Sequence, residues 1–276
     1  MNLVVQGPSL TPDQAAGLAR LAGSTRTEKI GAHAWRIRSA AAADSIPPYC
    51  EREHIDHAFI PEGSRFADLR LLAMDMDSTL ITIECVDELG DMAGCKTEIA
   101  AITAQAMRGE LDYPQSLRKR VSLLKGLAET SLLKVYQERL KLTPGAETLL
   151  GACKHHGVKV LLVSGGFTFF TDRLKQRLGI DYTISSTLEA KGGALTGQLL
   201  GAIVDADAKA AKFLAVARDL GIEKEETVAI GDGANDLKMM AQAGVSVAFR
   251  AKPVVRAQAT CAITWSGLDA VVNLFE

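Results

Sequence analysis

The chain has 276 residues, of which 47% are hydrophobic and 23% are charged, a balance that predicts a packed core and excludes wholesale disorder. Its 31 basic and 33 acidic residues give a formal net charge of −2, which excludes the broad basic field that nucleic acids and anionic membranes require. No apolar run approaches the about 18 residues that span a bilayer, and the N-terminus lacks a signal-peptide pattern, so we expect a cytoplasmic protein without a membrane partner.

Residues 1–65 differ in pattern from the rest of the chain. An apolar start at 3–5, a helical stretch at 15–23 and a second alternating stretch at 32–40 predict the order strand, helix, strand. The proline-bearing sequence that follows predicts a linker at 61–66. We therefore expect a small α+β N-terminal domain at 1–65, which loosely resembles an ACT-like regulatory domain.

From residue 69 onward the pattern predicts an α/β domain, at 66–276. Short apolar runs at 71–74, 158–163 and 227–230 are each followed by a polar or glycine-rich turn and a helical stretch. Such runs are typical of buried parallel strands with crossover helices. Ligands bind at the carboxyl ends of the strands in such sheets, so the polar residues after these three runs are the candidate site.

A long helical segment separates the first run from the second. Apolar residues there recur at helical spacing without a good strand, which predicts a helical cap at about 84–142, inserted after the first core strand. Thr143 and Pro144 then predict the N-cap and first residue of the next helix. Further on, Gly192 and Gly193 predict the turn of a hairpin at the sheet edge.

Asp75 and Asp77 follow the first run two residues apart, in the sequence LLAMDMDSTL. Side chains at i and i+2 of an extended segment point the same way, and two neighbouring carboxylates favour a shared Mg²⁺. A calcium loop starting at Asp75 would need glycine and glutamate where the chain has Leu80 and Val86. The EF-hand alternative is therefore excluded.

The other two strand ends carry a serine–glycine turn and an acidic glycine turn. Ser164, Gly165 and Gly166 offer a hydroxyl and free backbone N–H groups to an oxyanion, although the same letters also form ordinary turns. GDGAND at 231–236 supplies Asp232 and Asp236, and taken alone it fits a metal site or a plain turn equally well. The chain contains no P-loop, nucleophile elbow or dinucleotide fingerprint at these turns.

The order of these motifs around a helical insert resembles the haloacid dehalogenase (HAD) superfamily, whose first motif is DxDx[TV]. Within that superfamily, YPQSLRKRVSLLKGL at 113–127, VSGGF at 163–167 and GDGAND at 231–236 are similar to the phosphoserine phosphatases. The resemblance covers about residues 69–276. It implies a Rossmann-like HAD core with a parallel sheet under the helical cap.

The resemblance also implies roles for the strand-end residues. Asp75 would be the nucleophile that forms an aspartyl phosphate, and Asp77 would be the general acid and base. Mg²⁺ would lie between Asp75, the backbone carbonyl of Asp77, and Asp232. Ser164 and the Gly165 N–H would hold phosphate oxygens.

Further substrate contacts follow from the same resemblance. Lys209 would bind phosphate, with Lys212 as its nearest competitor; Asn235 would contact the substrate, and Asp236 would orient Lys209 or a metal-bound water. In the cap, Glu84 would meet the substrate's ammonium and Arg120 its carboxylate. Helical periodicity places Arg120 closer to the apolar stripe of its helix than its basic neighbours.

We therefore expect a Mg²⁺-dependent hydrolase that converts O-phospho-L-serine to serine and phosphate, the last step of serine biosynthesis. Two alternatives are a HAD phosphatase for another small phosphate ester and a catalytically silent regulatory HAD protein. The five cysteines form no CxxC pair, which indicates reduced thiols. A homodimer is a candidate assembly.

Overall fold

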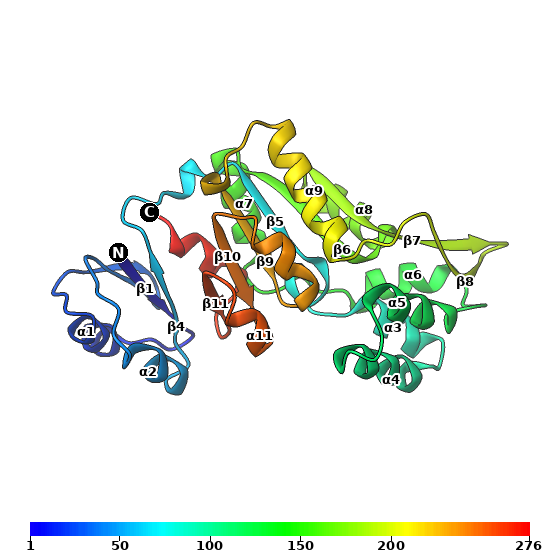
Figure 1. Cartoon of the computed structure of the whole chain (residues 1–276), viewed down its shortest axis with the longest axis horizontal. Helices are drawn as coiled ribbons and strands as arrows, with labels where there is room; N and C mark the ends of the chain where they lie inside the picture. Colours follow the sequence, from blue (N-terminus) through cyan, green and yellow to red (C-terminus); the bar gives the residue numbers. More distant parts are fainter.

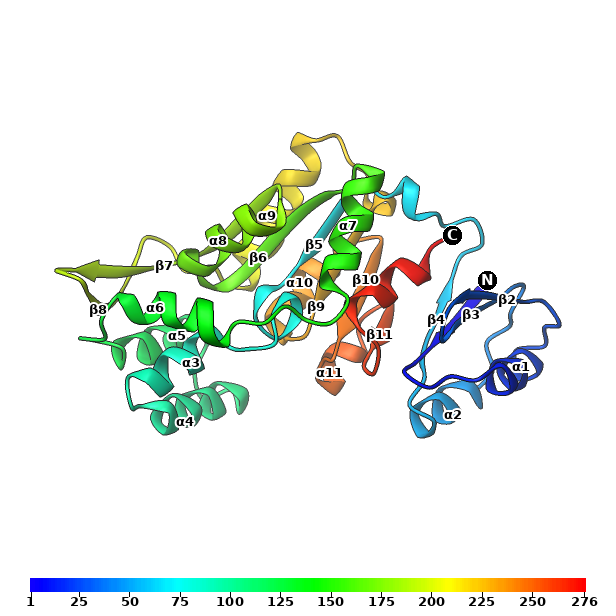
Figure 2. The same cartoon turned by 180° about the vertical axis from the view of Figure 1, so that it is seen from behind.

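Two β-sheets and a helical lobe follow one another along the long axis of the molecule (Figures 1 and 2). The computed structural model describes all 276 residues. The N-terminal sheet lies at one end, the larger C-terminal sheet in the middle, and the helices inserted after its first strand at the other end. All five cysteines are free, and no helix has the length and apolar character that crossing a membrane requires.

The N-terminal sheet has four antiparallel strands in the order β2-β3-β1-β4. Its elements are β1 (Asn2–Gln6), α1 (Pro12–Leu21), β2 (Thr27–Gly31), β3 (Ala34–Ile37), α2 (Ile46–Arg52) and β4 (Asp56–Ile60). The strand–helix–strand pattern predicted from sequence is thus only part of a βαββαβ unit. Strand β2 was missed because it is polar and largely exposed, and α2 and β4 because prolines and charges break up their apolar pattern.

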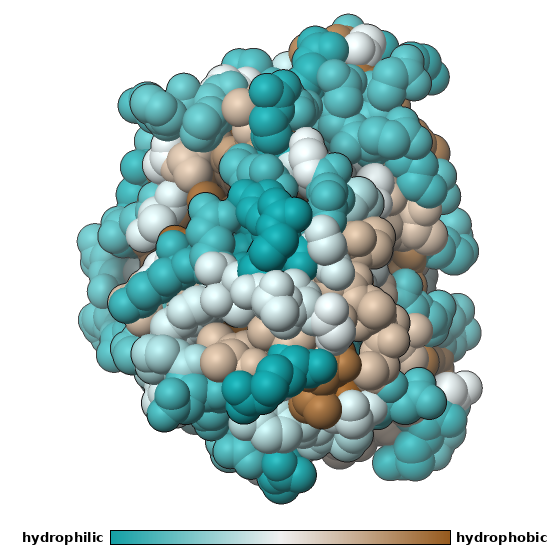
Figure 3. All heavy atoms as spheres, turned by 90° about the vertical axis from the view of Figure 1, so that its left-hand side faces the viewer, coloured by the Kyte–Doolittle hydropathy of each residue, from teal (hydrophilic) through white to brown (hydrophobic).

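Both faces of this sheet are covered, which explains why β3 is buried throughout. Trp35 and Ile37 pack with α1 and α2, whereas Val4 of β1 belongs to the core of the larger sheet. Arg36 is also buried and donates from Nη2 to the carbonyl oxygens of Asn273 and Phe275. Seen from this end, the outer surface is mostly hydrophilic (Figure 3).

The larger sheet has seven strands in the order β11-β10-β9-β5-β6-β7-β8. All are parallel except the edge strand β8, which pairs antiparallel with β7 in a hairpin. The strands are β5 (Leu71–Met74), β6 (Lys159–Phe167), β7 (Tyr182–Lys191), β8 (Ala194–Leu200), β9 (Thr227–Gly231), β10 (Val245–Phe249) and β11 (Cys261–Ile263). The helices beside it are α7 (Ala146–His156), α8 (Thr168–Leu178), α9 (Ala206–Asp219), α10 (Leu237–Met240) and α11 (Pro253–Arg256). This confirms the predicted Rossmann-like α/β fold with its edge hairpin.

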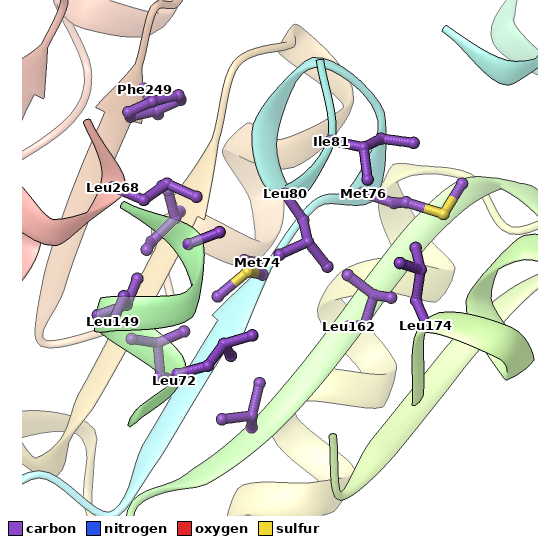
Figure 4. Packing of buried hydrophobic residues seen from close by; sticks show 14 of the residues in the cluster. Leu72, Met74, Met76, Leu80, Ile81, Leu149, Leu162, Leu174, Phe249 and Leu268 are labelled. Carbon is purple, nitrogen blue, oxygen red and sulfur yellow. The ribbon is translucent and has the colours of Figure 1, made fainter. Parts of the chain in front are cut away.

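Strand β5 buries side chains on both faces of the sheet, so its sequence is apolar at every position. Leu72 and Met74 point to the larger core cluster, and Leu71 and Ala73 to a second cluster that includes residues of α9 and α10. Figure 4 shows Leu72 and Met74 beside Leu149 of α7. Burial on both faces holds the carboxyl end of β5 rigidly, and the candidate site begins there.

The segment between β5 and α7 is helical, as its periodicity predicts. It contains α3 (Cys85–Met92), α4 (Lys96–Met107), α5 (Tyr113–Ser122) and α6 (Thr130–Lys134). The edge hairpin reaches over to it, because the Gly126 N–H donates to the Leu195 carbonyl and the Leu195 N–H donates to that of Leu127, both at 2.8 Å. The helical segment is therefore joined to the sheet at both of its ends and also through β8.

The predicted start of α7 is wrong by two residues. Thr143 does not cap this helix; Gly145 precedes it with a φ of 83°, and the helix begins at Ala146. A Cβ on Gly145 would lie 2.1 Å from Asp269 Oδ1, so a tertiary contact as well as the left-handed backbone requires glycine there. The sequence alone could not reveal a neighbour more than a hundred residues away.

Asp56 connects the N-terminal sheet to the larger one. This side chain on β4 is only 3% exposed, and its carboxylate accepts the backbone N–H groups of Thr264, Trp265 and Ser266 over 2.6–3.3 Å. The three N–H groups follow the edge strand β11 directly. A single carboxylate thus satisfies donors that the sheet leaves unpaired.

Asp56→Ala should therefore lower the free energy of unfolding by about 1–3 kcal/mol, because three partly buried N–H groups would lose their acceptor. Urea unfolding followed by circular dichroism measures this change. Asp44→Ala, at an exposed position of the same sheet region, is the matched control. Equal stability of the two variants would contradict this account of the contact.

Candidate active site

Three adjacent strands bring the sequence motifs together. The order β9-β5-β6 places β5 between the strands that carry the other two motifs, and all three are parallel. Their carboxyl ends therefore meet at one edge of the sheet. Asp75 follows β5, Asp232 follows β9, and Ser164 lies on β6 near its end.

The turn after β5 fixes the first carboxylate. Asp75 extends the strand pairing by donating its N–H to the Ile230 carbonyl, and its Oδ1 accepts the Met76 N–H at 2.7 Å. Three residues on, Ser78 has a φ of 55°, a left-handed conformation uncommon outside glycine. This bend turns the chain into the helical segment immediately after the acidic motif.

The same bend brings Asp77 and Glu84 into the site. Asp77 Oδ1 accepts the N–H of Cys85, the first residue of α3, at 3.1 Å. The hydroxyl of Ser78 donates to Glu84 Oε1 at 2.7 Å. The carboxylate of Asp77 is therefore held against the start of α3, and Glu84 is anchored to the turn after β5.

Lys209 of α9 lies fully buried between two carboxylates. Its Nζ is 3.0 Å from Asp75 Oδ1 and 2.7 Å from Asp236 Oδ1. Asp236 Oδ2 in turn accepts the Gly233 N–H at 3.1 Å. Lys209, and not its predicted competitor Lys212, thus reaches the site.

Carboxylate oxygens from Asp75, Asp232 and Asp236 lie within 4.8 Å of one another. Thr79 donates its hydroxyl to Asp232 Oδ1 at 3.3 Å. Such an all-oxygen set at close range fits a small divalent cation of the magnesium type. The side chain of Asp77 is not part of this group; the family resemblance implies its backbone carbonyl, and not its carboxylate, as the metal ligand.

The serine–glycine motif departs from the prediction in one detail. Strand β6 runs through Ser164 to Phe167 with a register shift after Val163, so the serine lies within the strand and not after it. The Gly166 N–H donates to Ser164 Oγ at 2.9 Å. A Cβ on Gly166 would lie 2.7 Å from Asp77 Oδ2, so only glycine allows the two motifs to approach this closely.

A cavity of about 640 Å³ lies between the strand ends and the helical segment. It is lined by Asp75, Asp77, Glu84, Arg120, Gly165, Asp232 and Asn235, among others. Arg120 is 8% exposed and its Nε has no partner, whereas the neighbouring Arg118 and Lys119 are exposed. Ser164 and Lys209 lie beneath this lining, fully buried.

Sequence reasoning missed one prominent residue of the cavity, Tyr113. A Cβ on Gly165 would lie 1.9 Å from the Tyr113 hydroxyl oxygen, so this ring of α5 lies directly over the serine–glycine turn. Asp112 caps α5 by accepting the Gln115 N–H at 2.7 Å. Helix start signals could have located Tyr113 at the first turn, but not its contact with a strand fifty residues away.

Burial raises the pKa of four carboxyl groups in the site, those of Asp75, Asp77, Glu84 and Asp232. The pKa of Asp77 rises to about 7 through burial and the nearby charge of Glu84, and that of Asp232 to about 7 through burial and Asp236. Burial and Asp236 also raise the pKa of Asp75, although Lys209 opposes them. Burial alone would lower the pKa of Lys209, but Asp236 and Asp75 raise it above the usual lysine value, so the lysine stays charged.

These shifts predict a pH-dependent stability in metal-free buffer. The pKa of Asp232 is higher in the folded state than its ordinary value of 3.8. Protonation of Asp232 therefore favours the folded state at pH values below the folded-state pKa. This contribution is lost as the pH rises through about 7. With EDTA present, the free energy of unfolding should therefore fall more steeply from pH 5 to pH 8 in the unaltered protein than in Asp232→Asn.

Urea titrations of both proteins at several pH values measure the two slopes. Added Mg²⁺ should restore stability at pH 8 in the unaltered protein, because a cation replaces the lost protons. Parallel slopes in the two proteins would contradict the raised pKa.

Comparisons with known protein families cover both parts of the chain. The haloacid dehalogenase-like hydrolase family matches residues 72–241, which include every candidate site residue. A domain of unknown function, DUF4072, matches residues 3–45 in the N-terminal sheet. The family match therefore spans the three strand-end motifs and the helical insert between them.

Relatives and solved structures agree with this match. A phosphoserine phosphatase of Polaromonas sp. is 55% identical over 217 residues, which cover 77% of this chain and 92% of the relative. The unliganded probable phosphoserine phosphatase of Vibrio cholerae has a TM-score of 0.86 and 40% identity, covering 99% of this chain and 85% of that one. A substrate-bound phosphoserine phosphatase has a TM-score of 0.71 and 39% identity, covering 75% of this chain and 99% of that one. The chain belongs to the haloacid dehalogenase-like hydrolase family.

Proposed function

We propose that this protein is a phosphoserine phosphatase that hydrolyses O-phospho-L-serine to L-serine and phosphate. One observation carries the substrate assignment. The cavity above the catalytic aspartates holds one acidic and one basic side chain from the helical segment, Glu84 and Arg120. Phosphoserine has an ammonium and a carboxylate besides its phosphate, and these two residues match both charges.

Asp75 is the proposed nucleophile. Its carboxylate is fixed by the Met76 N–H and by Lys209, so it faces the cavity in one orientation. Attack on phosphorus forms the Asp75–phosphate bond as the bond from phosphorus to the serine oxygen breaks. Water then attacks the same phosphorus, which releases phosphate and restores the carboxylate.

Asp77 is the proposed general acid and base. Its raised pKa of about 7 allows it to carry a proton near neutral pH and donate it to the departing serine oxygen. The resulting carboxylate then accepts a proton from the attacking water. Hydrogen bonding from the Cys85 N–H keeps the carboxylate in place during both steps.

The phosphoryl oxygens are proposed to bind Ser164, the Gly165 N–H and Lys209. Ser164 and Gly165 lie near the carboxyl end of β6, and Lys209 lies on α9. Burial there strengthens each electrostatic contact. Asn235 lines the cavity and is placed to contact the substrate. Asp236 holds Lys209 at 2.7 Å and thus orients it.

Mg²⁺ is the proposed cofactor, held by Asp75, Asp232 and the backbone carbonyl of Asp77. Bound there, the cation would neutralise phosphoryl charge. Both oxygens of Asp236 are engaged, one by Lys209 and the other by the Gly233 N–H. We therefore assign Asp236 to positioning Lys209.

Two alternatives are less well supported. A catalytically silent protein would not need a lysine buried between two carboxylates, because burying these charges costs free energy of desolvation. A phosphatase for another small ester would not need both charges of the Glu84–Arg120 pair. Membership in the phosphoserine phosphatase group of relatives supports the same choice.

The organisation of the chain is part of the proposal. We assign residues 1–65 to an N-terminal domain and 66–276 to the phosphatase domain, with the cap at about 84–142. The βαββαβ unit has the small α+β form expected for an ACT-like domain. A cytoplasmic location and a homodimeric assembly are likewise proposed.

Asp75→Asn should reduce kcat by about 10⁴-fold or more, because the amide keeps the size of the side chain but removes the attacking oxygen's charge. Steady-state phosphate release measures the loss. When the unaltered enzyme is quenched with acid while it turns over phosphoserine labelled with ³²P in its phosphate, label should be found on Asp75, because the phosphoryl group passes through that carboxylate. Asp207→Asn, an exposed acid on α9, is the control and should keep both the activity and the labelling of the protein. Turnover with no labelled Asp75 in the quenched enzyme would contradict the mechanism.

Arg120→Ala should lower kcat/KM for phosphoserine by about 30-fold to a few thousandfold, since it leaves a desolvated carboxylate without a partner. Hydrolysis of p-nitrophenyl phosphate, which has no carboxylate, should be nearly unaffected. The measurement is the ratio of kcat/KM for the two substrates, with Lys119→Ala as the exposed control on the same helix. A ratio equal to that of the unaltered enzyme would rule out phosphoserine recognition by Arg120.

A further inference from the structure

The cavity contains a buried hydroxyl that the proposed mechanism does not use. Ser116 of α5 is 1% exposed and lines the cavity. Its Oγ has no hydrogen-bond partner. Serine in a helix commonly donates to the carbonyl four residues earlier, but here the Asp112 carbonyl receives only the backbone N–H of Ser116.

A second unpartnered donor lies one turn further along the same helix. Arg120 is four residues after Ser116, so the two side chains share one face of α5. The Arg120 Nε is also buried and without a partner, and both residues line the cavity. Buried polar groups in proteins normally have partners, so two orphaned donors that face one cavity indicate a ligand with acceptor atoms.

The surroundings identify the acceptor. The phosphoryl group has its own donors at the strand ends, Ser164, the Gly165 N–H and Lys209. The acidic groups near this face of α5, Glu84 and Asp87, also line the cavity, and Glu84 already accepts from Ser78. A substrate carboxylate is the remaining anionic group, and its two oxygens match two donors.

We propose that Ser116 is a specificity residue: its Oγ–H donates to one oxygen of the substrate carboxylate while Arg120 binds the other. This inference rests on the proposed function and extends it. Ser116 adds a directional hydrogen bond to the charge of Arg120. The site therefore selects a carboxylate by the positions of its two oxygens as well as by its negative charge.

Ser116→Ala tests the proposal with two substrates that differ only in the carboxylate. Phosphoethanolamine has the phosphate and ammonium of phosphoserine but no carboxylate. The variant should lose about 10-fold to 150-fold in kcat/KM for phosphoserine, as for a hydrogen bond to a charged group. Its kcat/KM for phosphoethanolamine should stay within about twofold, since that substrate offers no acceptor there.

Stability gives a second readout that separates recognition from a structural role. Because the free protein buries this hydroxyl unsatisfied, Ser116→Ala should unfold at the same temperature or a higher one. Ser122→Ala is the matched control, since Ser122 is exposed on the same helix and donates to the Lys119 carbonyl. It should change neither substrate's kinetics.

The outcomes are distinct. Equal losses on both substrates, no loss on either, or a lowered unfolding temperature would each overturn the role of Ser116. If the unaltered enzyme does not hydrolyse phosphoserine, the proposed function fails first, and this inference fails with it.

Discussion

The buried charge of Lys209 is the constraint around which the site is arranged. A fully buried ammonium is costly unless opposite charges compensate it, and Asp75 and Asp236 do so at 3.0 and 2.7 Å. Each of these carboxylates belongs to a different strand end, so one side chain from α9 joins β5 to β9. Burial, together with the excess of carboxylates, raises the pKa of Asp75 and of Asp232 and makes the site receptive to protons or a divalent cation.

The chemistry and the recognition of the substrate arise from different parts of the fold. The proposed phosphoryl-binding groups lie near the carboxyl end of β6 and on the buried face of α9, where packing limits their movement. The residues that we propose for the amino acid end of the substrate, Glu84, Ser116 and Arg120, all lie on or beside the inserted helices. The Ser78–Glu84 hydrogen bond connects the two parts, and Tyr113 over Gly165 closes the gap between them. This division allows the cap to determine specificity without disturbing the phosphoryl site.

The N-terminal sheet depends on polar contacts to the last strand and the C-terminal segment. Asp56 accepts N–H groups that follow β11, Arg36 donates to the carbonyls of Asn273 and Phe275, and Gln6 donates to that of Ala270. The ends of the chain therefore pack against each other on the side away from the cap (Figure 1). The strands that carry the proposed catalytic groups, β9, β5 and β6, lie on the other side of β10 and β11 from this interface.

The sequence alone determined the α/β class, the three strand-end motifs and the helical insert, because apolar runs, helical periodicity and turn residues are local patterns. Its motif order also determined which aspartates to examine. Only the tertiary structure decided how far β6 extends, why Gly145 precedes α7, and that Tyr113 covers Gly165. Each of these depends on atoms brought together from distant parts of the chain. The unpartnered hydroxyl of Ser116 is the strongest case. The sequence around a helical serine is the same whether its hydroxyl contacts solvent, a backbone carbonyl or a cavity. Only the packing of the folded chain distinguishes these three environments.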